Sequence, residues 1–281
     1  MSVVVIGDAL IDELRDESGS VDAAGGSALN VAVGLSILGV PATLVAMYAD
    51  DADGRVLASH LDAYGVAAIP SPSPLGTGRA ISDRTSGEPR YEFSAAAVAR
   101  SIDFSPEVQE AIAKAAFVAV SGFPFDNQEQ VDLLVDATAG STLLVDPNPR
   151  AGFLRDARLF AANLERLAPA MRLLKLGEED ARLLYDEPLD RVVEYFAPHT
   201  TVLATAGAHG ATVYDRGVAT SRPIASSPEP IVDTLGAGDA TFAAVIAALS
   251  AGREDWGGIL DRAMAIAAAT VRQHGGVLRV P

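Results

Sequence analysis

The 281-residue chain is 49% hydrophobic and 21% charged, which is the composition of a soluble globular protein with a sizeable core. Its formal net charge of −16 argues against nucleic acid or an anionic membrane surface as a partner, because both need a basic patch. The absence of cysteine excludes disulfides, thiolate metal sites and a cysteine nucleophile.

The first predicted element is a wholly apolar strand over residues 2–6, as expected for a parallel strand buried on both faces. No basic leader precedes it, and no uninterrupted apolar run in the chain could span a bilayer, so we expect a cytoplasmic protein. Asp8 and Asp12 follow the strand, at the edge where open α/β sheets bind ligands. Turn and cap chemistry is the alternative for both. The Gly-x-Gly-x-x-Gly fingerprint is absent here, which excludes a nicotinamide-dependent oxidoreductase.

Gly25 and Gly26 open the next predicted helix, which runs to about Leu38. Paired glycines let the backbone approach a ligand closely. Asn30 follows about one helical turn after Gly26, so its amide can point back toward the same space. A tight turn followed by a polar first turn is the structural alternative.

A strand over residues 42–47 and a helix over residues 55–64 are predicted next. From residue 66 to residue 94, short β-prone runs are broken by proline and glycine. We expect this segment and residues 14–24 to form a small antiparallel sheet outside the main sheet. A thin sheet with poorly covered faces needs a partner, so it is expected to act as a lid, as a homodimer surface, or as both.

Helices and strands then alternate. The predicted helices cover residues 106–115, 128–138, 157–168 and 189–196, with a second Ala-rich helix over 259–274 near the C-terminus. The predicted strands cover residues 117–120, 142–145, 173–176 and 201–205, followed by a β-hairpin across 211–220. Polar and glycine-containing clusters recur just after the strands. The pattern predicts one α/β domain over residues 1–281, with a small β insertion.

The sequence between Asp233 and Leu249 has the clearest chemical character. Gly236, Ala237 and Gly238 form a small-residue turn that leads into an Ala-rich helix. Such a turn aims backbone N–H groups and a helix dipole at one point, which suits an oxyanion or a phosphate.

Asp239 follows at the mouth of this turn. A carboxylate there repels a bound anion, but it can deprotonate a hydroxyl beside the phosphoryl group that the hydroxyl attacks. Capping of the helix is the structural alternative. The four histidines have no metal-ligand spacing, and neither a Walker P-loop nor a Gly-x-Ser-x-Gly elbow occurs. The parts that remain are those that phosphoryl transfer needs.

Residues 25–32 (Gly-Gly-Ser-Ala-Leu-Asn-Val-Ala) and 233–239 (Asp-Thr-Leu-Gly-Ala-Gly-Asp) resemble the two signatures of the ribokinase-like (PfkB) carbohydrate kinases. Their spacing and the α/β order between them resemble that family over essentially the whole chain. The resemblance implies a three-layer fold, with a mostly parallel central sheet flanked by helices and a β lid. It also implies ATP-dependent phosphorylation of a sugar or nucleoside hydroxyl.

The resemblance assigns roles by position. Asp239 would be the catalytic base, with Gly236, Ala237 and Gly238 as the anion hole. The implied substrate-binding residues are Asp8, Asp12, Gly25, Gly26, Asn30 and Arg150. The implied ATP-binding residues are Lys175, Thr205, Gly207 and Gly210. Asp233 lies where family members often bind a monovalent cation, which suggests K⁺.

One departure from the family concerns magnesium. The family's Asn-x-x-Glu element, which helps to organise Mg²⁺ and the phosphates, appears here as Gly177-Glu178-Glu179-Asp180. An amide is lost and the last carboxylate is one methylene shorter. Asp180, or Glu179 by a small shift, is the expected divalent-metal residue, acting through a bound water. The affinity for Mg²⁺ is the property that this change affects.

The leading hypothesis is an ATP-dependent sugar kinase that phosphorylates a primary hydroxyl of a small carbohydrate. The segments 7–12 and 146–150 resemble the fructokinase and 2-keto-3-deoxygluconate kinase branch, which indicates a fructose-like sugar or a keto-deoxy sugar acid. A nucleoside kinase is the alternative on the same fold. A catalytically weak ligand-binding or regulatory protein is the alternative from another class, motivated by the altered Asn-x-x-Glu element.

Overall fold

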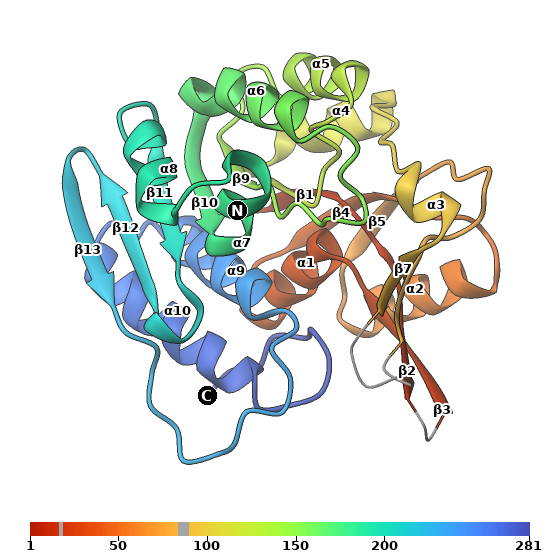
Figure 1. Ribbon diagram of the computed structural model, residues 1–281. Coiled ribbons are helices and arrows are strands. Elements are labelled where there is room, and N and C mark those ends of the chain that lie inside the picture. The colour runs from red at the N-terminus through yellow and green to blue at the C-terminus, as the bar shows by residue number, and fades with distance from the viewer. Residues whose placement is uncertain (17–18, 84–89) are drawn as a thin grey trace.

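The computed structural model describes residues 1–16, 19–83 and 90–281. Within these ranges a nine-stranded sheet has the order β13-β12-β11-β10-β9-β8-β1-β4-β5 (Figure 1). Its strands are β1 (Val3–Gly7), β4 (Ala42–Met47), β5 (Ala67–Ser71), β8 (Phe117–Ser121), β9 (Leu143–Asp146), β10 (Met171–Gly177), β11 (Thr201–Thr205), β12 (Ala211–Asp215) and β13 (Val218–Arg222). The strands from β11 to β5 are parallel, and β12 and β13 add an antiparallel hairpin at one edge. The expected mostly parallel sheet is confirmed.

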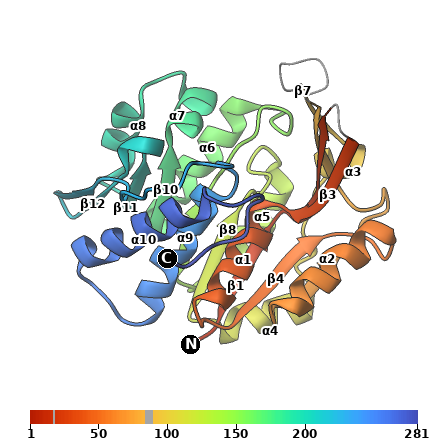
Figure 2. The ribbon, with the colours of Figure 1, turned by 90° about the horizontal axis from the view of Figure 1, so that it is seen from below.

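Helices cover both faces of this sheet (Figures 1 and 2). One apolar layer involves α1 (Ser27–Ile37), α2 (Ala52–Ala63), α9 (Ala237–Ser250) and α10 (Trp256–Thr270). The other involves α4 (Pro106–Lys114), α5 (Gln128–Ala137), α6 (Ala157–Leu167), α7 (Glu178–Tyr185) and α8 (Leu189–Phe196). Short helical turns occur at α3 (Ala95–Val98), η1 (Ala168–Ala170) and η2 (Gly207–His209). Because both faces are covered, a central strand such as β1 is apolar and buried at every position. None of the helices within the described ranges is long and apolar enough to cross a bilayer.

Helices α1 and α9 pack directly against each other at the centre of the molecule. Both consist largely of small residues; a Cβ added to Gly34 of α1 would lie 3.0 Å from the Cβ of Ala243 in α9. Small side chains allow the two backbones to approach closely. This packing brings the start of α1 and the start of α9 together, although about 210 residues separate them in the sequence.

A second, four-stranded sheet has the order β3-β2-β6-β7. Its strands are β2 (Leu10–Asp16), β3 (Gly19–Gly25), β6 (Arg79–Asp83) and β7 (Arg90–Phe93). The expected small sheet is therefore present, but it starts at Leu10, and β2 and β6 pair in parallel. A parallel pair needs a long crossover, and the chain provides one between β2 and β6 through β3, α1, β4, α2 and β5.

Two further boundaries differ from the prediction. Residues 67–71, expected in the small sheet, form β5 and pair with β4 at the edge of the large sheet. Pro70 suits an edge strand because it has no N–H to donate, and it also made this run look like part of a separate sheet. Helix α2 begins at Ala52 rather than residue 55, because Asp51 accepts the N–H of Gly54 and caps it earlier. Residues 17–18 and 84–89 of the expected lid lie outside the described residues.

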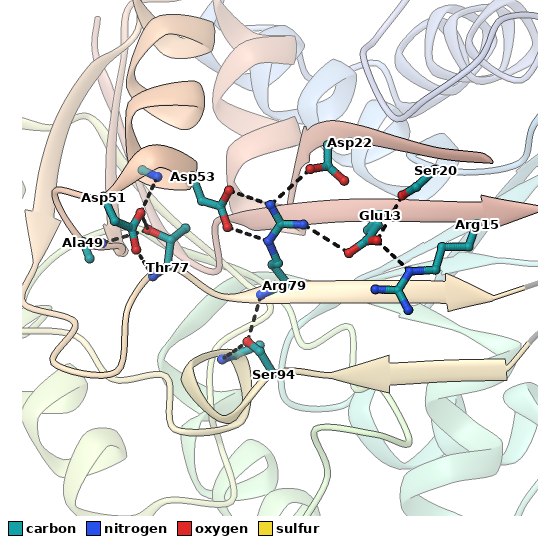
Figure 3. Close-up of polar contacts among 12 residues, drawn as sticks. Glu13, Arg15, Ser20, Asp22, Ala49, Asp51, Asp53, Thr77, Arg79 and Ser94 are labelled. Atoms are coloured by element: carbon teal, nitrogen blue, oxygen red, sulfur yellow. Dashed lines mark hydrogen bonds and ion pairs between the residues drawn. The ribbon is translucent and has the colours of Figure 1, made fainter.

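Arg79 joins the small sheet to α2 (Figure 3). Its guanidinium forms a bidentate pair with Asp53 of α2, at 2.5 Å and 2.6 Å. It also donates to Glu13 of β2 and to Asp22 of β3, both at 3.1 Å. Bonds from Arg15, Ser20 and Arg79 lower the pKa of Glu13 to about 2. One arginine on β6 thus links two other strands of the small sheet to the main body.

Replacing Arg79 by Met is expected to lower the free energy of unfolding by about 1–3 kcal/mol. This loss is smaller than the loss on breaking a fully buried ion pair, because the Arg79 side chain is 29% exposed. Asp22 and Asp53 would then lose the cation between them, and Glu13 would keep only its pair with Arg15. Chemical denaturation measures the stability, and hydrogen exchange should show faster opening of β2 and β6. Arg55→Met is the matched control, since Arg55 makes a single exposed bond to Asp50 at 3.3 Å. Equal effects of the two substitutions would contradict this role of Arg79.

Candidate active site

A cavity of about 570 Å³ lies between the carboxyl edge of the large sheet and the small sheet. Most of the residues predicted at a site meet there. Those that line the cavity are Asp8, Asp12, Gly26, Asn30, Arg150, Lys175, Glu179, Asp233, Gly236, Gly238 and Asp239. Those that do not line it are Gly25, Asp180, Thr205, Gly207, Gly210 and Ala237.

Asp239 is held from the first turn of α1. One carboxylate oxygen accepts the hydroxyl of Ser27 at 2.6 Å, and the other accepts the amide of Asn30 at 2.9 Å. Ser27 also contacts the hydroxyl of Ser121, at the end of β8, at 2.5 Å. These bonds fix the carboxylate by contacts outside its own helix. The capping alternative for Asp239 is therefore not what the structure shows.

Burial raises the pKa of Asp239, and the charge of Asp146 adds to the effect, whereas the bonds from Ser27 and Asn30 oppose it. The carboxylate is 7% exposed and lines the cavity. A base with a raised pKa binds a proton more readily than an exposed aspartate does. Sequence reasoning missed Ser27 and Ser121. Ser27 directly follows the double glycine and could have been suspected from that position.

The start of α9 has no side-chain cap. Gly236 has a φ of 73°, and a Cβ there would lie 2.3 Å from the carbonyl oxygen of Gly276, so glycine is required. Helices α2, α5, α6 and α10 instead begin at Asp or Asn side chains that accept N–H bonds. An uncapped helix start beside a cavity presents N–H donors and a positive dipole end, which is the geometry of an anion site.

Asp8 and Asp12 lie on the side of the cavity nearest to β2. Asp8 accepts the N–H of Ala28 at 3.1 Å, and burial raises its pKa to about 6 against the opposing effects of that bond and of Arg100. Burial also raises the pKa of Asp12 to about 7, with further contributions from the charges of Asp8 and Asp239. Two carboxylates in one partly apolar cavity are suited to accept hydrogen bonds from neutral hydroxyl groups.

The two glycines before α1 have different roles. Gly26 lines the cavity with a φ of 105°, and a Cβ there would lie 2.7 Å from the carbonyl oxygen of Asp8. A Cβ on Gly25 would lie 2.0 Å from a carboxylate oxygen of Asp12. Gly25 therefore makes room for the Asp12 side chain.

A model of the pfkB family of carbohydrate kinases matches residues 2–281. The chain belongs to this family. A fructokinase from Rhizobium leguminosarum bv. trifolii is 30% identical over 261 residues, covering 88% of this chain and 79% of the relative. The expected family, enzyme class and fold are thereby confirmed.

Two solved structures of related fold show how widely this PfkB architecture is used. A putative ribokinase II from E. coli, in complex with ATP and Mg²⁺, has a TM-score of 0.81 and 22% identity, covering 98% of this chain and 94% of that one. An adenosine kinase from Sinorhizobium meliloti has a TM-score of 0.80 and 22% identity, covering 98% and 95%. At this identity the likeness establishes the fold and leaves the acceptor open.

A buried ion pair lies behind the start of α9 in this PfkB chain. Lys175 of β10 donates to Asp146 at the end of β9 at 2.9 Å, with the side chains 6% and 0% exposed. Burial alone would lower the pKa of Lys175, but the charges of Asp146 and Asp180 outweigh it and raise the pKa. A Cβ on Gly238 would lie 3.3 Å from the ammonium, so the charge lies directly at the anion turn.

The expected metal residues separate into two groups. Asp180 is buried and accepts the N–H of Gly177 at 2.6 Å, and burial raises its pKa to about 6 against the effect of Lys175. Glu179 is half exposed and paired with Arg150 at 3.2 Å. Asp146, not predicted as a site residue, has one buried carboxylate oxygen without a hydrogen-bond partner in the described part of the chain.

These residues fit a magnesium ion. An unpartnered buried carboxylate oxygen is costly, and a hydrated cation would satisfy it. Within the described ranges no three His, Asp or Glu side chains are grouped to hold a metal by themselves. Mg²⁺ needs no such group, because it commonly takes one or two carboxylates, waters and substrate phosphates.

Of the four predicted nucleotide residues, Lys175 lines the cavity, whereas Thr205, Gly207 and Gly210 do not and lie at or just after the end of β11. Thr205 donates to the carbonyl oxygen of Leu176 at 3.3 Å. Gly210 has a φ of 94°, and a Cβ there would lie 2.1 Å from the carbonyl oxygen of Arg222, whereas Gly207 faces open space. Their role in binding a nucleotide stays a prediction.

Asp233 braces the loop before α9. Its carboxylate accepts the N–H of Leu235 at 3.0 Å and the N–H of Gly275 at 3.2 Å. The loop that carries the anion turn is thereby attached to the segment after α10. The proposed monovalent-cation role of Asp233 stays a prediction.

Proposed function

We propose that the protein is an ATP-dependent kinase that phosphorylates a primary hydroxyl of a neutral, fructose-like monosaccharide. The observation that carries this proposal is the position of Asp239. Its carboxylate lines a cavity between an uncapped helix start and two carboxylates suited to sugar hydroxyls. A base, an anion site and an acceptor site thus share one cavity.

The charges around the cavity favour a neutral acceptor over a sugar acid. Asp8 and Asp12 line the acceptor end and would repel a carboxylate or phosphate on the substrate. Two cations also line the cavity, but Lys175 is paired with Asp146 and Arg150 with Glu179. The similarity to a fructokinase supports the same choice.

The reaction follows from these positions. Asp239 accepts the proton of the acceptor hydroxyl while the hydroxyl oxygen forms a bond to the γ-phosphorus of ATP. The bond between the γ-phosphorus and the β,γ-bridging oxygen breaks, and its electron pair leaves with ADP. A positioned base contributes roughly 100- to 10,000-fold to such a rate. The N–H groups of Gly236 and Gly238 offset the charge that develops on the phosphoryl oxygens, and such a donor contributes a factor of about 100 to 1,000. The N–H of Ala237 is already donated to the carbonyl oxygen of Thr234 at 3.4 Å.

Three binding roles complete the proposal. Asp146 and Asp180 would hold Mg²⁺, which neutralises charge on the ATP phosphates when bound. Thr205, Gly207 and Gly210 would contact the nucleotide. Asp233 would support a K⁺ ion, and the small sheet would act as a lid and as a homodimer surface.

The proposal is tested by measuring ADP release from ATP and Mg²⁺ with a panel of acceptors. The panel contains D-fructose and other neutral monosaccharides, 2-keto-3-deoxygluconate, fructose 6-phosphate and adenosine. We expect turnover with a neutral sugar and at least tenfold lower kcat/KM for the charged sugars. Preference for adenosine would support the nucleoside kinase alternative. Binding of acceptors without any turnover would support the weakly catalytic alternative.

A further inference from the structure

The wall that the small sheet presents to the cavity is mostly apolar. Neighbouring side chains of β2 and β6 share a face, because Asp12 pairs with Ala80 and Leu14 with Ser82 in the parallel register. All four residues line the cavity. Phe93 of β7 pairs with Ala80, also lines the cavity and packs on Phe153 with ring centroids 4.2 Å apart.

Ser82 places a hydroxyl in this wall. The residue is 7% exposed, and its Oγ has no hydrogen-bond partner in the part of the chain that the structure describes. Side chains alternate along a strand, so Arg79 points to the opposite face from Ser82, toward α2 (Figure 3). The ion pair of Arg79 with Glu13 therefore does not supply a hydrogen-bond partner for the Ser82 hydroxyl. A buried hydroxyl without a partner is costly unless a ligand provides one.

The position of Ser82 indicates which part of a ligand would meet it. Asp8, Asp12 and Leu14 follow one another along the chain that leaves the large sheet for the small one, and Ser82 lies beside Leu14. Two residues of a strand span about 6–7 Å, so the Ser82 row lies roughly that far beyond the Asp12 row. A group near Ser82 is therefore at the end of the acceptor remote from Asp239.

We propose that Ser82 is a specificity-determining residue whose hydroxyl hydrogen-bonds a non-reacting hydroxyl at the remote end of the neutral acceptor. This inference rests on the proposed function and deepens it. The hydroxyl can donate and accept, so it matches a neutral sugar hydroxyl. The surrounding apolar side chains exclude water, which strengthens the contact and penalises an acceptor that lacks the matching group.

The test compares the wild-type protein with Ser82→Ala, using D-fructose and its monodeoxy analogues as acceptors in the ADP-release measurement. If another neutral sugar of the panel is the best acceptor, that sugar and its deoxy analogues take their place. We expect Ser82→Ala to raise KM for the parent sugar about 3- to 10-fold, with kcat and KM for ATP unchanged. For one deoxy analogue the two proteins should have equal KM, because the contact is already missing.

Ser20→Ala is the matched control, because Ser20 lies on the same small sheet but donates to Glu13 and does not line the cavity. It should leave KM for every acceptor unchanged. Circular dichroism melting checks that both variants fold. An unchanged KM for the parent sugar in Ser82→Ala, or an equal rise for the sugar and all its deoxy analogues, would overturn the proposal for Ser82 alone. Wild-type protein that turns over no acceptor would overturn the proposed function and this inference with it.

Discussion

Replacing Asp239 by Asn is expected to lower kcat by about 100- to 10,000-fold, because the substitution removes the base and little else. An Asn amide can still accept from Asn30 and donate to Ser27, which in turn contacts Ser121. The site should therefore keep its shape, and KM for ATP should change little. Steady-state kinetics with the best acceptor measures both parameters.

The same substitution should not destabilise the protein at neutral pH. Burial raises the pKa of Asp239, so the folded state holds its proton more tightly than the unfolded state does. The free energy of unfolding therefore falls as the pH rises from the unfolded pKa through the folded pKa of Asp239, because the buried carboxyl group then ionises. A neutral Asn at this position does not ionise and avoids that loss. We expect an equal or higher Tm at pH 7. Exposed Asp190→Asn is the control for both measurements, and unchanged kcat in Asp239→Asn would refute the assignment of the base.

Replacing Lys175 by Met is expected to destabilise the protein by about 3–5 kcal/mol, the usual cost of leaving one partner of a buried ion pair unpaired. Asp146 would then be fully buried without its cation. Activity should also fall at least tenfold, since the ammonium lies at the anion turn next to Gly238. Chemical denaturation and turnover are measured on the same preparation.

The double variant Lys175→Met/Asp146→Leu separates the two effects. An apolar pair in place of a buried ion pair is often neutral or stabilising, so the free energy of unfolding should recover. Turnover should not recover, because both the ammonium of Lys175 and the carboxylate of Asp146 are gone. Recovery of activity together with stability would show that Lys175 has a structural role only.

The sequence was sufficient to predict the layers of the fold. Buried parallel strands such as β1 are continuous apolar runs, and the helices after them have clear glycine or proline boundaries. Strand β5 was misplaced because Pro70 and the proline-rich turn after it look like an irregular insertion. Whether residues 67–71 pair with β4 or join the small sheet depends on long-range contacts that a local pattern does not contain.

The candidate site was predicted as a set of motifs but not as a set of contacts. The two glycine turns and Asp239 are adjacent to recognisable signatures. The bond from Ser27 to Asp239 spans 212 positions, and the Lys175–Asp146 pair joins the ends of separate strands. The role of Gly25 could not be predicted from the local sequence either. Its backbone lies close to the Asp12 carboxylate only because β2 and β3 pair.

The packing of α1 against α9 has a consequence for biosynthesis. Residues 27–35 of α1 are all buried, and many of their neighbours belong to α9, which leaves the ribosome some 200 residues later. In a nascent chain that ends before residue 237, this apolar segment therefore has no α9 to pack against, and the cavity is incomplete. Exposed apolar surface of this kind makes an incomplete chain prone to aggregate, and a ligand of the cavity cannot stabilise it during translation because Asp239 has not yet been made.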